Sequence, residues 1–198
     1  MTAFPPASPD GTPPRDEILE ATRHWLTRAV IGLNLCPFAK SVYVKQQIRY
    51  AISEATGLEQ VLADLETELL ALANADASEI DTTLLIFPHA LADFADFNDC
   101  LYFADRLSGQ LGLEGTLQIA SFHPQYQFEG TAPDDIENYT NRAPYPILHL
   151  LREASIARAV DAFPDAADIY ERNQETLRRM GPAGWREWMS RQTPEDGE

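Results

Sequence analysis

Hydrophobic residues recur every three or four positions in five segments of the chain, a spacing that predicts amphipathic helices. We expect the first helix to end at Cys36, because Pro37 disfavours helical backbone in the residue before it. Pro146 suits the first turn of the fourth helix, and Gly181 can close the last one. The five segments are residues 16–35, 58–72, 94–107, 146–160 and 165–180.

Three other segments carry strand patterns. Residues 42–52 alternate apolar and polar side chains with an interruption in the middle, whereas residues 82–87 and 117–122 are short runs typical of strands buried on both faces. Strands alternate with helices, and crossovers of helical length join parallel strands. The pattern predicts an α/β fold: a small, mainly parallel sheet of three to four strands, flanked by helices and followed by C-terminal helices.

A long segment without any period, residues 123–146, follows the third strand and contains four prolines. A loop of this size in a domain is usually functional or disordered, and this one is too rich in aromatic residues to be disordered. Residues 15–190 are expected to form a single domain. Residues 1–14 are expected to form a disordered proline-rich leader, and residues 191–198 a flexible tail.

Charge narrows the classes of function. The chain has 15 basic and 31 acidic side chains in 198 residues, a formal net charge of −16. Nucleic-acid binding needs a basic surface, and anionic membranes also repel such a chain, so neither is an expected partner. No apolar run is long enough to span a membrane, and the N-terminal residues lack the basic-then-apolar pattern of an export signal, so neither a membrane span nor export is expected. Cys36 and Cys100 are expected to be free thiols, which favours the cytoplasm.

Polar residues follow the predicted strands at their carboxyl ends. Glu54 comes after the first strand, His89 after the second and His123 after the third. Open parallel sheets bind ligands in the crevice beyond these ends, so the three side chains should share one edge, covered by the loop 123–146. His123 could be a general base or a metal ligand there, or a capping histidine bonded to the loop backbone.

Arg142 lies shortly before the predicted helix at residue 146, next to Asn141. Helix N-termini and guanidinium groups both bind carboxylate or phosphate, so these two residues are candidates for binding an anionic substrate. The alternative is that Arg142 holds the loop by bonding main-chain carbonyls or Asp134 and Asp135. His149 would lie in the first helical turn, where the dipole keeps an imidazole neutral, unless it is simply packed.

Three more side chains complete the candidate site. Cys36 could be a nucleophile or a metal thiolate, although a buried structural thiol is the alternative. Tyr126 and Tyr145 could line a pocket for a planar ligand, or they could hold the loop in place.

Four motifs are distinctive: LNLCPF at residues 33–38, SFHP at 121–124, TNR at 140–142 and LHLLRE at 148–153. Together they resemble the family called domain of unknown function 1415, over about residues 16–181. The resemblance implies no reaction, because no activity is established for that family. It does single out eight positions: Cys36, His123, Tyr126, Asn141, Arg142, Tyr145, His149 and Arg152.

The leading hypothesis is an enzyme that acts on a small anionic molecule. It uses His123, His149 and Cys36 as catalytic residues, with Arg142, Asn141, Tyr126 and Tyr145 binding the substrate. Two alternatives stay open. One is a protein that binds a transition metal or haem through Cys36 and histidines, including His89. The other is a module that binds a partner protein without chemistry.

Overall fold

A computed structural model describes residues 13–162 and 168–191. Nearly all of the proposed leader and tail lies outside the described residues. Within them are six α-helices, one π-helical segment, η1, and one 3-10 helix, η2. Their bounds are α1 Arg15–Trp25, η1 Leu26–Ile31, α2 Ala39–Val44, α3 Leu58–Asn74, α4 Phe94–Gln110, η2 Ile136–Thr140, α5 Glu153–Ala162 and α6 Ile169–Ser190.

The sheet has four strands in the order β1-β2-β4-β3 and is mixed. Strands β1 (Ile48–Ile52) and β2 (Thr82–Ile86) pair in parallel, whereas β4 (Ile147–Arg152) runs antiparallel to both β2 and β3 (Leu117–Phe122). The prediction of a mainly parallel sheet was therefore wrong. The three expected strands do point in one direction, but the fourth strand separates β2 from β3.

The fourth strand replaces the first half of the helix expected at residues 146–160. Residues 147–152 form β4, and helix α5 begins only at Glu153. A short apolar run such as Ile147–Leu151 fits a buried strand and a buried helical segment equally well, so periodicity could not separate them. Pairing with a neighbour on each side satisfies every main-chain group of this run, and three of its side chains are completely buried: Ile147, Leu148 and Leu150.

The N-terminal third also differs from expectation. The helix expected over residues 16–35 changes to π-helical hydrogen bonding at Leu26 and ends at Ile31. The strand expected from residue 42 begins at Ile48, because the preceding residues form the short helix α2. The expected helices over 58–72 and 94–107 are confirmed as α3 and α4.

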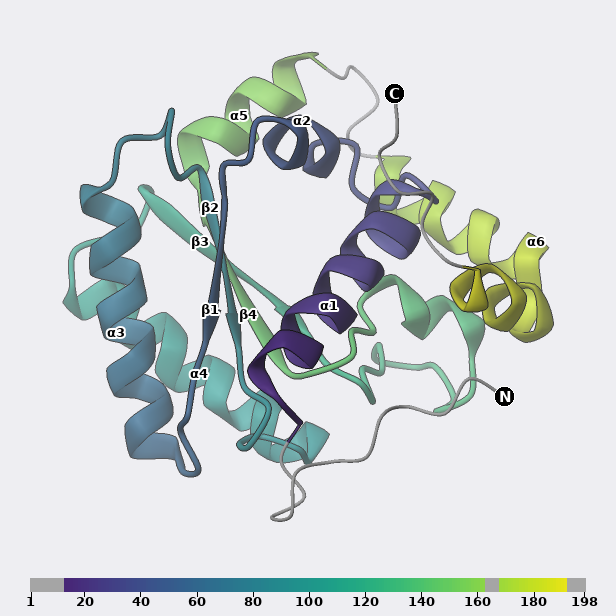
Figure 1. Ribbon diagram of the computed structural model, residues 1–198, viewed down its shortest axis with the longest axis horizontal. Helices are drawn as coiled ribbons and strands as arrows, with labels where there is room; N and C mark the ends of the chain where they lie inside the picture. Colours follow the sequence, from purple (N-terminus) through teal and green to yellow (C-terminus); the bar gives the residue numbers. More distant parts are fainter. Residues whose placement is uncertain (1–12, 163–167, 192–198) are drawn as a thin grey trace.

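Helices cover both faces of the sheet, as Figure 1 shows: α3 and α4 lie on one side, and α1 and α6 on the other. The first core cluster joins α3 and α4 to the sheet through side chains such as Leu65, Phe97 and Leu85. The second cluster joins α1 to the opposite face through side chains such as Trp25 and Leu84. The sheet therefore separates two apolar layers, and strand parity decides which layer a side chain enters.

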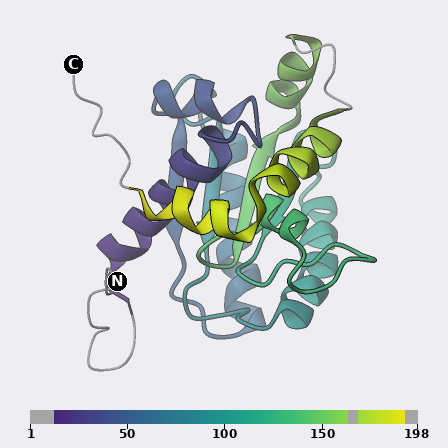
Figure 2. The ribbon, with the colours of Figure 1, turned by 90° about the vertical axis from the view of Figure 1, so that its right-hand side faces the viewer.

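Helix α6 is bent at Gly181, where φ is 66° and ψ is 172°, and Pro182 follows. The last helix was expected over residues 165–180, of which 165–167 lie outside the described residues, with Trp185 and Trp188 packing a short terminal turn onto the body. The two tryptophans do pack there, but the chain resumes a helical course after Gly181 instead of ending its helix. Figure 2 shows this bent helix in front of the sheet. In the part of the chain that the structure describes, no helix combines the length and apolarity needed to cross a membrane.

Candidate functional site

The two histidines expected to act together lie on opposite faces of the sheet. His123 follows β3, and its ring centroid lies 5.0 Å from that of Phe97 in the first core. His149, in β4, pairs with Leu84 of the neighbouring strand β2. Its ring centroid lies 6.2 Å from that of Phe122, which belongs to the second core. Because side chains alternate across strands, the sheet stands between the two rings. They cannot act on the same atom of a substrate.

His123 is completely buried, and the main chain uses both of its ring nitrogens. Nε2 donates to the Leu91 carbonyl at 2.9 Å, and Nδ1 accepts from the Gln125 amide at 3.0 Å. These partners assign the neutral Nε2–H tautomer. Burial lowers the pKa of His123, which favours the same neutral form. This geometry matches the alternative for His123, a capping histidine that bonds main-chain atoms.

Arg142 is also committed to the loop. Its Nε donates to the Tyr126 carbonyl at 3.2 Å, a terminal nitrogen donates to the Pro133 carbonyl at 2.5 Å, and the guanidinium lies 4.5 Å from the Tyr139 ring centroid. The helix N-terminus expected beside Arg142 is absent, because a strand begins at Ile147. The expected anion-binding arrangement at this point is therefore not formed.

Two more of the polar residues bond main-chain atoms. Asn141 Nδ2 donates to the Ser121 carbonyl at 3.1 Å, and the Asn141 carbonyl accepts from the His123 amide. Arg152 bonds the last turn of α3 and the turn that follows it. Its guanidinium donates to the carbonyls of Leu72, Ala75 and Ile80.

His149 has a different environment from the one expected, because it lies in the middle of a strand. Its Nε2 is 2.6 Å from Thr82 Oγ1, which in turn donates to the Leu150 carbonyl at 2.6 Å. A carbonyl only accepts, so the single hydroxyl proton is used there and Nε2 must carry the imidazole proton. Nδ1 has no hydrogen-bond partner among the described residues. Protein atoms crowd the ring, and burial lowers the pKa of His149 to about 4, yet the residue is not fully buried.

Cys36 and Tyr145 both pack against the second core cluster, the one on the His149 side of the sheet. Burial raises the pKa of the Cys36 thiol, an effect that hydrogen bonds from the main chain of Phe38 and Ala39 partly offset. Cys36 is thus a protonated thiol at neutral pH. Burial also raises the pKa of the Tyr145 hydroxyl, and the Glu17 carboxylate acts in the same direction.

Glu54 and His89 lie together at the edge where β1, β2 and β3 end, as the sequence predicted. His89 Nε2 lies 3.8 Å from a carboxylate oxygen of Glu54, whose side chain is 75% exposed and also lies 3.8 Å from Arg15. The His123 ring at this edge faces main-chain atoms instead. No group of three or more His, Cys, Asp or Glu side chains is arranged to hold a metal ion in the described ranges.

Comparison with known families adds one finding. Residues 17–187 match the family model described as a protein of unknown function (DUF1415). The chain belongs to the DUF1415 family. No curated protein and no solved structure matches it.

In this DUF1415 chain, the eight positions singled out by the resemblance divide into two groups. One group bonds main-chain atoms: His123, Asn141, Arg142 and Arg152. In the other group, the side chains of Tyr126, Tyr145 and His149 make no hydrogen bond to main-chain atoms among the described residues, and the Cys36 thiol only accepts from the nearby main chain of Phe38 and Ala39. Tyr126 packs its ring on Phe94 and Phe128. His149 is the member of this second group with a titratable nitrogen.

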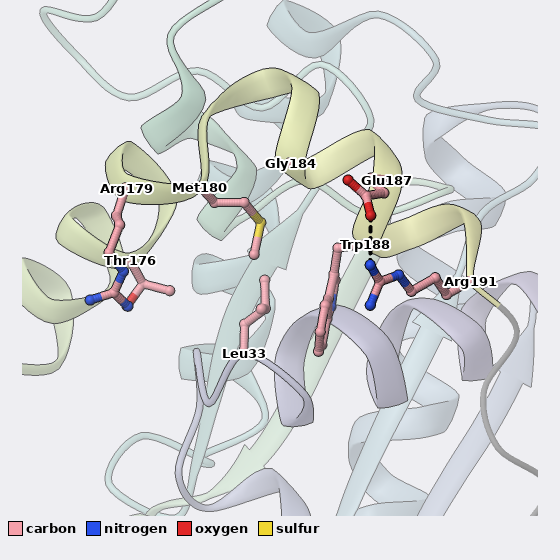
Figure 3. A pocket seen from close by; sticks show the side chains of 8 residues that line it. All are labelled: Leu33, Thr176, Arg179, Met180, Gly184, Glu187, Trp188 and Arg191. Atoms are coloured by element: carbon pink, nitrogen blue, oxygen red, sulfur yellow. Dashed lines mark hydrogen bonds and ion pairs between the residues drawn. The ribbon is translucent and has the colours of Figure 1, made fainter.

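Sequence reasoning missed a cavity of about 350 Å³ between the end of η1 and helix α6. Figure 3 shows its lining residues: Leu33, Thr176, Arg179, Met180, Gly184, Glu187, Trp188 and Arg191. A usable signal was present, because Arg172, Thr176 and Arg179 recur at the spacing of one helical face.

Proposed function

We propose that this DUF1415 protein is an enzyme that acts on a small anionic molecule, with His149 as its acid/base group. One observation supports this most: His149 is a neutral imidazole whose Nε2 proton is held by Thr82 while Nδ1 has no hydrogen-bond partner among the described residues. A fixed tautomer with a free lone pair is the state that a general base requires.

The lowered pKa of His149 is compatible with an anionic substrate. At about 4, the imidazole is a weak base in the free protein. A negative charge placed near the ring favours its protonated form and raises its pKa toward neutrality. An anionic substrate would therefore strengthen the base that acts on it, whereas a neutral substrate would leave it weak.

Cys36 is the nucleophile in this proposal. Its thiol packs on the same side of the sheet as His149 and is protonated at neutral pH, so it needs a base before it can attack. Neither cysteine forms a disulfide, a state that a reducing compartment such as the cytoplasm preserves.

The test is a screen of purified protein against small carboxylates, phosphate esters and thioesters, with turnover followed by mass spectrometry. His149→Gln keeps a polar side chain of similar size but cannot exchange a proton. His89→Gln is the matched control, since His89 lies at the sheet edge beside Glu54. We expect at least one compound to be converted by wild type and by His89→Gln, and roughly a hundredfold less by His149→Gln.

Turnover that survives in His149→Gln would remove His149 from the mechanism. Turnover of neutral analogues at the same rate would contradict the anionic class. If wild type converts none of the compounds, the proposal fails and a non-catalytic binding role gains support.

A further inference from the structure

The bend in α6 forms a groove against the end of η1. Residues from both halves of the helix, before and after Gly181, line the 350 Å³ cavity, and Leu33 lies opposite them. A smaller cavity of about 120 Å³ shares Leu33 and Thr176 with it and extends toward Pro37. The two together make an elongated groove along α6.

One end of this groove is polar and positively charged. Thr176 and Arg179 lie there, and Arg172 belongs to the same helical face because the three positions are four and three residues apart. Neither the Arg179 guanidinium nor the Thr176 hydroxyl has a hydrogen-bond or ion-pair partner in the part of the chain that the structure describes. At the other end, Arg191 is neutralised by Glu187 at 2.6 Å.

The middle of the groove is apolar. Leu33, Met180 and Trp188 lie between the two polar ends in Figure 3. The indole nitrogen of Trp188 already donates to the Arg28 carbonyl at 2.8 Å, and the Arg28 guanidinium lies 4.2 Å from the ring centroid. The polar atom of Trp188 is thus satisfied, and its ring offers the groove apolar surface only.

We propose that this groove binds a small amphipathic oxyanion, either a carboxylate or a phosphate monoester. Thr176 and Arg179 bind the oxyanion, and Leu33, Met180 and Trp188 cover the apolar body. In a chain of net charge −16, an arginine without a partner beside an apolar cavity is complementary to such a ligand. The volume is at the lower end for small-molecule sites, which excludes a folded partner as the occupant of this cavity.

This site goes beyond the proposed function. None of its residues belongs to the His149 site, and its test measures binding without turnover, so each proposal can fail while the other holds.

The test is calorimetric titration of the full chain with octanoate, octyl phosphate and the uncharged octanol. Arg179→Gln removes the charge, and Thr176→Val removes the hydroxyl at nearly constant volume. Arg186→Gln is the matched control, an exposed arginine on the same helix outside the groove. We expect wild type and Arg186→Gln to bind one of the two oxyanions alike, and Arg179→Gln to bind it roughly tenfold more weakly or worse.

Thr176→Val should lower the affinity for the same oxyanion by a smaller factor. Octanol should bind every variant with the same low affinity. The preferred oxyanion identifies the head group as carboxylate or phosphate. Equal affinity of wild type and Arg179→Gln would overturn the proposal, and so would the absence of saturable binding of both oxyanions to wild type. Circular dichroism of each variant confirms that the fold is retained.

Discussion

At the scale of single residues, hydrogen-bond partners divide side chains that the sequence had grouped together. His123 and Arg142 were selected because of the long loop around them, and both bond main-chain atoms. His123 accepts from the Gln125 amide inside the loop and donates to the Leu91 carbonyl outside it, whereas Arg142 donates to two carbonyls of the loop. The sequence indicates which polar residues stand out from the surrounding pattern. Hydrogen-bond partners distant in the chain decide the role of each one. The Leu91 carbonyl that accepts from His123 lies 32 residues earlier, beyond any local pattern.

Replacement of His123 by alanine should destabilise the fold. The substitution leaves the Leu91 carbonyl and the Gln125 amide without partners and opens a cavity beside Phe94 and Phe97, so the free energy of unfolding should fall by about 3 kcal/mol. Urea unfolding followed by circular dichroism measures the loss. His89→Ala is the control and should cost about 0.5 kcal/mol or less. An unchanged urea midpoint in His123→Ala would contradict the structural role.

The stability of the protein should depend on the protonation of His149. Its pKa is 6.5 when exposed and about 4 in the folded state, so the unfolded chain takes up a proton first as the pH falls. The stabilisation is full above pH 6.5 and is lost between pH 6.5 and 4, by up to about 3 kcal/mol. In His149→Gln, the fall in unfolding free energy between pH 7 and 5 should be smaller than in wild type. Parallel pH profiles for the two proteins would contradict the lowered pKa.

At the scale of elements, the sequence predicted most of the helices and strands. It failed where a short apolar run fits a buried strand and a buried helical segment equally well. Helices α3 and α4 and strands β2 and β3 have strong periods or clear boundaries. Residues 147–152 have neither, and their assignment as a helix placed His149 beside a helix dipole that does not exist. A strand assignment, combined with the register that pairs Ala120 with His149, puts His149 and His123 on opposite faces. The π-helical turn η1 leaves no signal in the pattern of side chains.

The bend in α6 should depend on glycine at position 181. Its backbone, at φ 66° and ψ 172°, lies in a region that essentially glycine alone adopts, although no atom would contact an added Cβ. Gly181→Ala should therefore lower the free energy of unfolding by about 1–3 kcal/mol through backbone strain. Chemical denaturation measures it.

Gly57→Ser serves as its control, because Gly57 has extended backbone at φ −152° and open space around it. The control should lose no stability, since serine is a good residue at a helix N-cap. A Gly181→Ala protein as stable as wild type would show that α6 can straighten without cost, and the groove beside it would then not depend on the bend.

At the scale of the whole molecule, repulsion among acidic side chains opposes folding. Among the described residues, four arginine–carboxylate pairs lie within 4.0 Å. Pairs with exposed members contribute little to stability. A net charge of −16 spread over the remaining surface is a larger effect. The net charge follows from composition alone, whereas the ion pairs depend on the fold.

Salt should consequently stabilise the protein. Raising the NaCl concentration from about 0.02 M to about 0.5 M shortens the Debye length several-fold, and the melting temperature should rise by roughly 3–6 °C. Differential scanning calorimetry at the two concentrations gives the value. A melting temperature that falls with salt would mean that attractive pairs outweigh the repulsion.

The position of β4 has a consequence for the order in which the chain can assemble. Strands β2 and β3 leave the ribosome before residues 147–152, yet each needs β4 as a neighbour. Until then, both nascent strands expose unpaired edges that favour aggregation. A transcript truncated before codon 147 therefore encodes the β1–β2 pair and a lone β3 with no strand to join them, and the cell should clear its product rather than accumulate it.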